Sequence, residues 1–231
     1  MIVRFLLSFL ICWSCPAFSA GFITHVLLTD RFLAKENIVE KSERQEFFQG
    51  SLFPDIRYMA HIDRKQTHTL GESLSSIQKE ESFFEKGKKF HSFVDEKRIQ
   101  FVSKSTILAH LAAHYPDNPD QILFLKTAED EIFHALLTQN EIQTSFTTIS
   151  NDIKKYAIDP AVVKEYYDCV QSYCRAGPIE LIEVAIKNHS DFFFIPLGQL
   201  KIYRHNLEIA QHDPILQKHC QDLLAASQEW K

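Results

Sequence analysis

Residues 73–101, which read SLSSIQKEESFFEKGKKFHSFVDEKRIQF from Ser73 to Phe101, are the longest stretch with apolar side chains at helical spacing. Apolar residues recur three and four positions apart, which favours one long helical segment with Gly87 as the place for any bend. His91 and Asp95 stand four positions apart. On a helix they therefore project from the same face and can close on one ion.

The same spacing continues along the rest of the chain, which has only 6 glycines and 8 prolines. Alternating strand-like runs flanked by turn signals are scarce, so we predict an all-α, single-domain, multi-helix bundle. Asp159-Pro160, Gly177-Pro178 and Asp213-Pro214 are start signals, because proline is tolerated in a first helical turn. The other predicted helices cover residues 23–34, 44–48, 104–114, 121–138, 161–174, 178–188, 199–212 and 215–226.

The first 19 residues have the features of a secretory signal peptide. Arg4 gives a basic start, residues 5–13 are almost wholly apolar, and the small residues Ala17 and Ser19 end the segment. Cleavage after Ser19 puts the small residues Ala17 and Ser19 at the two positions where a signal-peptide cleavage site requires them. It makes Ala20 the mature amino terminus. The sequence therefore predicts a secreted or periplasmic protein without a transmembrane anchor after processing.

Residues 20–231 are then the mature protein, which we interpret as one helical domain, although the length also permits two. Loss of residues 1–19 removes one basic residue and no acidic one, so the formal charge changes from -5 to -6. That balance argues against binding of duplex DNA. Residues 20–135 contain the candidate metal ligands, and residues 136–231 supply the C-terminal helices.

The cysteines predict a disulfide. Cys12 and Cys15 lie in the predicted signal peptide, which leaves three cysteines in an oxidising compartment. One disulfide and one free thiol are expected, and the pairing is Cys174 with Cys220 or Cys169 with Cys220.

Taken one at a time, the candidate ligands have ordinary interpretations. Asp55 follows a proline at a position where it would cap a helix, and a single histidine such as His25 or His68 more often bonds to a backbone carbonyl. Lys126 and Asp130 have the i,i+4 spacing of a surface pair. The metal hypothesis depends on the combination and order of the ligands, since imidazole and carboxylate suit zinc.

That order is Thr24-His25, Phe53-Pro-Asp55-Ile, Thr67-His68 and Phe90-His91-Ser-Phe-Val-Asp95. Over residues 20–135 it resembles the zinc-dependent phospholipase C family, whose all-helical fold is shared by the related fungal single-strand-specific zinc nucleases. In that family the mature amino terminus is itself a metal ligand. The resemblance implies two zinc ions, one held by Ala20 and His25, another by Asp55, His68 and His91, with Asp95 bridging them.

The chain also departs from the family pattern. The family terminus is usually tryptophan, whereas Ala20 offers only backbone ligands. The family also has a histidine shortly after the bridging aspartate and a His-xxx-Glu pair, which bind a third zinc, and no histidine follows Asp95 closely here. A replacement site is conceivable, although two of its histidines also fit the flank of an amphipathic helix. The candidates for this additional metal are His110, His114, Glu129 and His134.

The resemblance implies a metal-dependent phosphoric diester hydrolase of the phospholipase C type. Zinc-activated water would cleave a phospholipid or another phosphodiester, and Asp55 would steer that water as a general base. Two alternatives remain open, a single-strand-specific zinc nuclease and a non-catalytic exported helical protein with a structural zinc site. The substrate headgroup and the oligomeric state are not encoded in any pattern that we can interpret.

Overall fold

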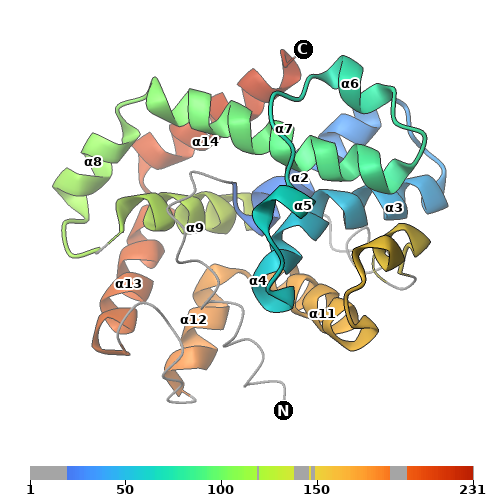
Figure 1. Ribbon diagram of the computed structural model, residues 1–231. Coiled ribbons are helices and arrows are strands. Elements are labelled where there is room, and N and C mark those ends of the chain that lie inside the picture. Colours follow the sequence, from blue (N-terminus) through green and yellow to red (C-terminus); the bar gives the residue numbers. More distant parts are fainter. Residues whose placement is uncertain (1–19, 119, 138–145, 147–148, 188–196, 231) are drawn as a thin grey trace.

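All regular secondary structure in the described part of the chain is helical, which confirms the predicted all-α fold. The computed structural model describes residues 20–118, 120–137, 146, 149–187 and 197–230 (Figure 1). The predicted signal peptide, with Cys12 and Cys15, lies outside these residues. None of the described helices is both long and apolar enough to cross a bilayer.

The long helices follow the predicted segments closely. Two start signals act as expected, because the Asp159 carboxylate accepts a hydrogen bond from the Ala161 amide and the Asp213 carboxylate accepts one from Ile215. The long helices are α2 (Phe22–Lys35), α3 (Lys41–Leu52), α7 (Phe83–Ser103), α8 (Ile107–His114), α9 (Gln121–His134), α11 (Pro160–Ala176), α12 (Pro178–Lys187), α13 (Leu197–Ala210) and α14 (Pro214–Gln228).

Five short elements complete the set: η1 (Phe53–Ile56), α4 (Arg57–Ala60), α5 (Arg64–Thr67), α6 (Leu74–Gln78) and η2 (Asn151–Tyr156). The predicted segment 73–101 is therefore two helices, and its interruption lies between Gln78 and Phe83, not at Gly87. The reason is local, because the Ser82 hydroxyl accepts a hydrogen bond from the Glu85 amide and so starts α7 with a new N-cap. Asp55 lies within η1 and is buried.

Two glycines let α3 and α7 pack backbone against backbone (Figure 1). A Cβ atom added at Gly50 would overlap the carbonyl oxygen of Phe84, and one added at Gly87 would overlap that of Phe47. Gly87 therefore serves the contact between the helices while α7 continues through it without a break. No larger residue fits at either position without moving one helix away from the other.

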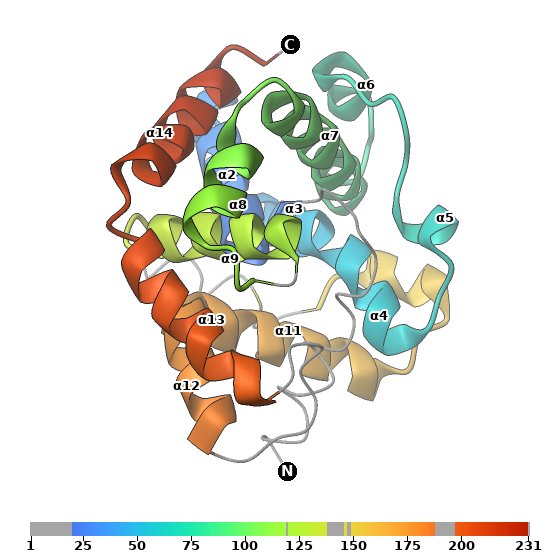
Figure 2. The ribbon, with the colours of Figure 1, turned by 90° about the vertical axis from the view of Figure 1, so that its left-hand side faces the viewer.

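The core is shared by both predicted halves of the chain. One buried cluster joins side chains of α2, α3 and α7 to those of α11, and a second surrounds α8 and α13. α9 and α14 contribute to both clusters, Phe133 and Leu223 to the first and Phe124 and Leu216 to the second (Figure 2). Residues before and after 135 therefore fold around common apolar contacts.

The predicted disulfide is wrong. Cys169, Cys174 and Cys220 are all free and buried, the first two on α11 and the third on α14. Burial raises the pKa of Cys169 to about 11 and raises the pKa values of Cys174 and Cys220 as well. Each is thus a protonated, unreactive thiol that packs as a small apolar side chain.

We predict that Gly87→Ala destabilises the protein by about 1–3 kcal/mol, because the new methyl group forces α3 and α7 apart. Gly198→Ala is the matched control. Outside its own helix backbone, no atom of the described residues lies within 4 Å of a Cβ at that helical position, so alanine should be neutral or stabilising by up to about 1 kcal/mol. Urea unfolding of both variants measures the difference, and equal stability would contradict the proposed close contact.

Candidate metal centre

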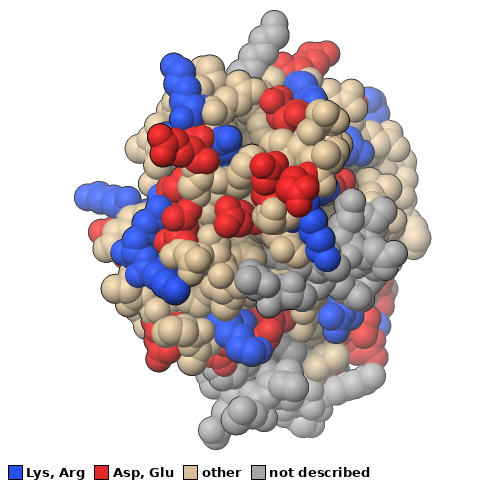
Figure 3. Space-filling view, turned by 90° about the vertical axis from the view of Figure 1, so that its right-hand side faces the viewer, with Lys and Arg blue, Asp and Glu red and all other residues tan. Residues whose placement is uncertain are grey.

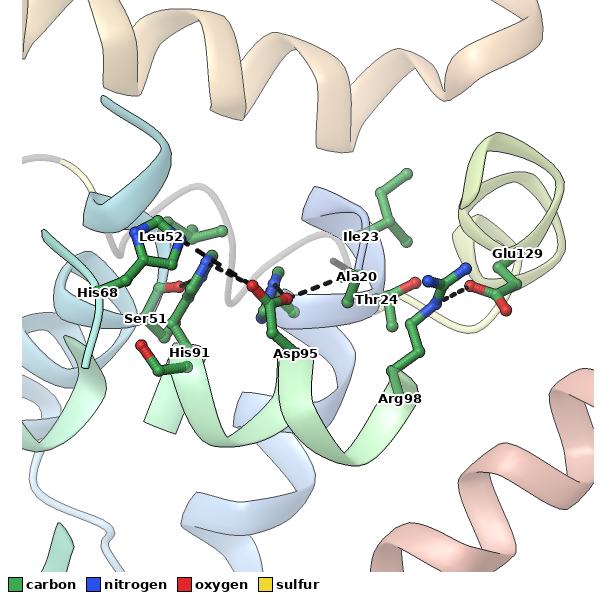
Figure 4. A network of polar contacts seen from close by, with 12 residues as sticks. Ala20, Ile23, Thr24, Ser51, Leu52, His68, His91, Asp95, Arg98 and Glu129 are labelled. Atoms are coloured by element: carbon green, nitrogen blue, oxygen red, sulfur yellow. Dashed lines mark hydrogen bonds and ion pairs between the residues drawn. The ribbon is translucent and has the colours of Figure 1, made fainter. Parts of the chain in front are cut away.

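The Asp95 carboxylate lies at the centre of a buried polar cluster (Figure 4). Its Oδ1 atom accepts a hydrogen bond from the Ala20 amide at 2.9 Å and lies 3.2 Å from His25 Nε2. Its Oδ2 atom lies 3.5 Å from His91 Nε2 and 4.0 Å from His68 Nε2. The structure therefore brings together side chains from the start of α2, the end of α5 and the middle of α7.

Five of the six predicted ligands form two overlapping groups. In each group the potential ligand atoms lie within 4.8 Å of one another, and His91 belongs to both. Asp55 joins from η1, and the Ala20 amide touches the carboxylate of the first group. The groups are His25, His91 and Asp95, and Asp55, His68 and His91.

Hydrogen bonds at the far side of two rings set their tautomers. His91 Nδ1 donates to the Ser51 carbonyl at 2.8 Å, and His68 Nδ1 lies 2.9 Å from the Thr67 hydroxyl. Because the Thr67 hydroxyl donates to the Arg64 carbonyl at 3.3 Å, it accepts from the His68 ring. Both Nε2 atoms are then lone-pair donors that point into the cluster, as ring nitrogens do at metal sites.

Several polar atoms of the cluster have no hydrogen-bond partner among the described residues. They are His25 Nδ1, His68 Nε2, His91 Nε2 and Asp95 Oδ2, and all are buried. Buried polar atoms of this kind are rare, since each costs free energy when it is unsatisfied. The unsatisfied Nε2 atoms of His68 and His91 lie 4.0 and 3.5 Å from the unsatisfied Asp95 Oδ2. This arrangement fits a bound cation, and the donor set fits zinc.

Burial also sets the charges of the cluster. It lowers the pKa of His68 to about 2, with further lowering by His91, and lowers the pKa of His91 to about 4, with further lowering by His25. For Asp95, burial raises the pKa, but the imidazoles of His91 and His25 outweigh it and hold the pKa well below its usual range. At neutral pH the site thus has an ionised carboxylate beside neutral imidazoles, the forms that bind metals.

Asp130 is a site residue that the sequence did not reveal. It is fully buried, and its carboxylate accepts hydrogen bonds from the Thr24 amide and hydroxyl at 2.9 and 2.8 Å and from the Tyr173 hydroxyl at 3.1 Å. A Cβ at Gly21 would overlap this carboxylate. Asp130 therefore fixes the start of α2 beside Asp95, and the predicted surface pair with Lys126 is wrong because both residues are buried.

The four residues considered for an additional metal do not converge. Glu129 forms a buried network with Arg98 at 2.6 Å and His219 at 2.9 Å (Figure 4). His110 pairs with Asp213 at 2.8 Å, and His114 and His134 bond to backbone carbonyls. No group of metal ligands in the described part of the chain includes any of these four residues.

Two arginines lie at the edge of the cluster. Arg64 Nη2 is 3.9 Å from Asp95 Oδ2, and its side chain is 41% exposed, so its guanidinium connects the buried carboxylate to solvent. Arg57 stacks on the ring of Tyr58, 3.8 Å from its centroid. Both guanidinium groups help to lower the pKa of His68.

Comparisons with protein families, with curated proteins and with solved structures found no match for this chain. The resemblance to the zinc-dependent phospholipase C family therefore stays a prediction from the sequence motifs.

We predict that the metal-free protein loses stability as the pH falls from about 6.5 to 4. In this range the unfolded histidines take up protons, whereas the folded His91, with a pKa of about 4, and His68, with a pKa of about 2, remain neutral. Each contributes a slope of at most about 1.4 kcal/mol per pH unit. Urea unfolding with chelator should give a flatter profile for His68→Gln/His91→Gln, and an unchanged slope would contradict the assignment.

Proposed function

We propose that this protein is an exported, zinc-dependent phosphodiester hydrolase of the phospholipase C type. The observation that carries the proposal is that His68 Nε2, His91 Nε2 and Asp95 Oδ2, all buried and without a hydrogen-bond partner among the described residues, lie together in one cluster with His25 and Asp55. A purely structural hydrogen-bond network would satisfy these atoms within the protein. The predicted mature terminus, Ala20, lies at the same carboxylate, as the family resemblance requires.

The two groups of neighbouring ligand atoms suggest which residues would hold each zinc ion. Ala20 and His25 would hold one zinc, and Asp55, His68 and His91 the other, with Asp95 between them. The neutral imidazoles of His68 and His91 and the ionised Asp95 carboxylate need no proton loss on binding at neutral pH. A terminal amine at Ala20 would release a proton when it binds zinc. The Ser51 carbonyl supports the set by holding the His91 ring in the required orientation.

Bound zinc would supply Lewis acidity and lower the pKa of its water to about 7. The chain supplies the other functions. Asp55 is 5% exposed and, as a carboxylate beside the ligands, is placed to take the proton of the attacking water. Arg64 is placed to bind the non-bridging oxygens of the phosphodiester from the solvent side, since its cation already lies near Asp95.

The surface favours a lipid or small phosphodiester over nucleic acid as the substrate. Single-strand nucleases stack bases on exposed rings, but no phenylalanine, tyrosine or tryptophan in the described residues is exposed, whereas Leu70, two positions after His68, is 87% exposed. On the face shown in Figure 3, basic and acidic side chains are interspersed. That face therefore offers no continuous basic surface for a polyanion.

We predict that the processed protein binds about two equivalents of zinc and that His91→Ala lowers kcat/KM for a chromogenic phosphodiester by at least about 100-fold. His91 belongs to both ligand groups, so its loss should also reduce the zinc content. His110→Ala is the matched control, because His110 is paired with Asp213 outside the cluster. Metal analysis and steady-state kinetics measure both effects.

Three outcomes would count against this function. Zinc that stabilises the protein without any phosphodiesterase activity would identify a structural site. Cleavage of single-stranded DNA without release of a phosphorylated headgroup from phospholipid would identify a nuclease. Equal activity of wild type and His91→Ala would remove the cluster from the reaction altogether.

We further predict that a short, uncleavable extension before Ala20 reduces the zinc content from about two equivalents to one and lowers kcat/KM at least about 100-fold. The extension converts the terminal amine into an amide, which can donate to Asp95 but cannot bind zinc. The control is the same chain with a protease site that restores Ala20 as the terminus. Full zinc content and full activity in the extended form would exclude Ala20 as a ligand.

A further inference from the structure

A cavity lies on the opposite face of α7 from the metal ligands. It has a volume of about 460 Å³ and lies between α2, α6, α7 and the end of α14, which meet at the top of Figure 2. Cavities of about 300–1,000 Å³ can bury most of a small ligand. Its apolar lining consists of Leu28, Phe32, Leu74, Phe90, Phe93 and Trp230.

Two basic side chains also line this cavity. Arg31 and Lys35 line the cavity and are one turn apart on α2. Lys35 Nζ donates to the Gln228 carbonyl at 3.0 Å, whereas Arg31 has no partner among the described residues.

The acidic residue next to Arg31 on α2 is already paired, because Asp30 binds Arg44 at 2.6 Å. Glu36, next to Lys35, accepts a hydrogen bond from the neutral Gln78 amide at 2.7 Å and keeps its charge. The chain as a whole carries a formal charge of -5. A cavity with aromatic walls and the Arg31 cation at its rim therefore favours ligands that are both apolar and anionic.

We propose that this cavity binds an amphiphile with one alkyl or acyl chain and one anionic head group. The chain would lie on the rings of Phe90, Phe93 and Phe32, and the head group would bind Arg31 with Lys35 beside it. The site is separate from the metal cluster, because His91 and Asp95 point away from the face of α7 that carries Phe90 and Phe93. The proposal therefore does not depend on the hydrolase function.

A tryptophan in the cavity provides a fluorescence signal for ligand binding. Trp230 lines the cavity, with its ring edge-on to Phe93 at a centroid distance of 5.7 Å. The other tryptophan of the chain, Trp13, lies in the predicted signal peptide. In a chain with Trp13→Phe, tryptophan emission reports on the cavity whether or not residues 1–19 are removed.

The experiment is a fluorescence titration with hexanoate, octanoate and decanoate below their micelle concentrations, with and without chelator. We expect saturable changes in emission, an affinity that rises about fourfold per methylene group, and at least fivefold weaker binding of decanol. Arg31→Gln should abolish the preference of decanoate over decanol. Lys201→Gln, which removes an exposed charge on α13, should keep it.

One further variant tests where the ligand binds, and a comparison of two ligands identifies the head group. Ala34→Phe adds a ring at an exposed helical position that lines the cavity and should weaken binding at least tenfold without a change in Tm. Binding of decanoate but not decyl phosphate assigns a carboxylate head group, and the reverse assigns a phosphate. The proposal is overturned if neither gives a saturable change, if decyltrimethylammonium binds as tightly, or if Ala34→Phe binds normally.

Discussion

The buried negative charge of Asp95 is the constraint around which the site is organised. A carboxylate in the protein interior is unfavourable unless hydrogen bonds or a cation compensate it. Here the compensation comes from one backbone amide, that of Ala20, and from imidazoles that burial keeps neutral. The unsatisfied Nε2 atoms of His68 and His91 lie 4.0 and 3.5 Å from the unsatisfied Asp95 Oδ2. A cation bound between these three atoms would satisfy them together.

The packing of α3 on α7 links the fold to the chemistry of this site. Gly50 and Gly87 bring the two backbones into contact, and each has a neighbour in the cluster. Ser51 follows Gly50, and His91 lies one turn after Gly87 on the same face of α7. The close approach therefore places the Ser51 carbonyl 2.8 Å from His91 Nδ1. The same contact that sets the distance between two long helices also selects the tautomer of a predicted ligand.

Periodic patterns predicted the long helices and the shared face of His91 and Asp95, because both follow from the 3.6-residue repeat. The short elements that carry Asp55 and His68 were not predicted, since they depend on local geometry such as the left-handed backbone at His61, with φ of 53°. Contacts across long sequence separations were also missed. Asp130 binds Thr24 across 106 residues. Arg98 forms an ion pair with Glu129, which was a candidate ligand of the additional metal. Neither partner leaves a local signature. The disulfide was predicted from the number of cysteines and the expected compartment, whereas the structure has buried free thiols, two on α11 and one on α14.

Contacts from α9 hold the start of α2 in position without a metal ion. In the family that the sequence resembles, a His-xxx-Glu pair is devoted to a third zinc, whereas here Glu129 and Asp130 of α9 bind protein groups. Asp130 holds the Thr24 amide and hydroxyl, and the absence of a side chain at Gly21 lets its carboxylate lie against the backbone next to Ala20. The position of Ala20 relative to Asp95 is thus determined by contacts that need no cation. If Ala20 is the mature terminus and a metal ligand, as proposed, it would lose little conformational freedom on binding, and more of the interaction free energy would appear as affinity.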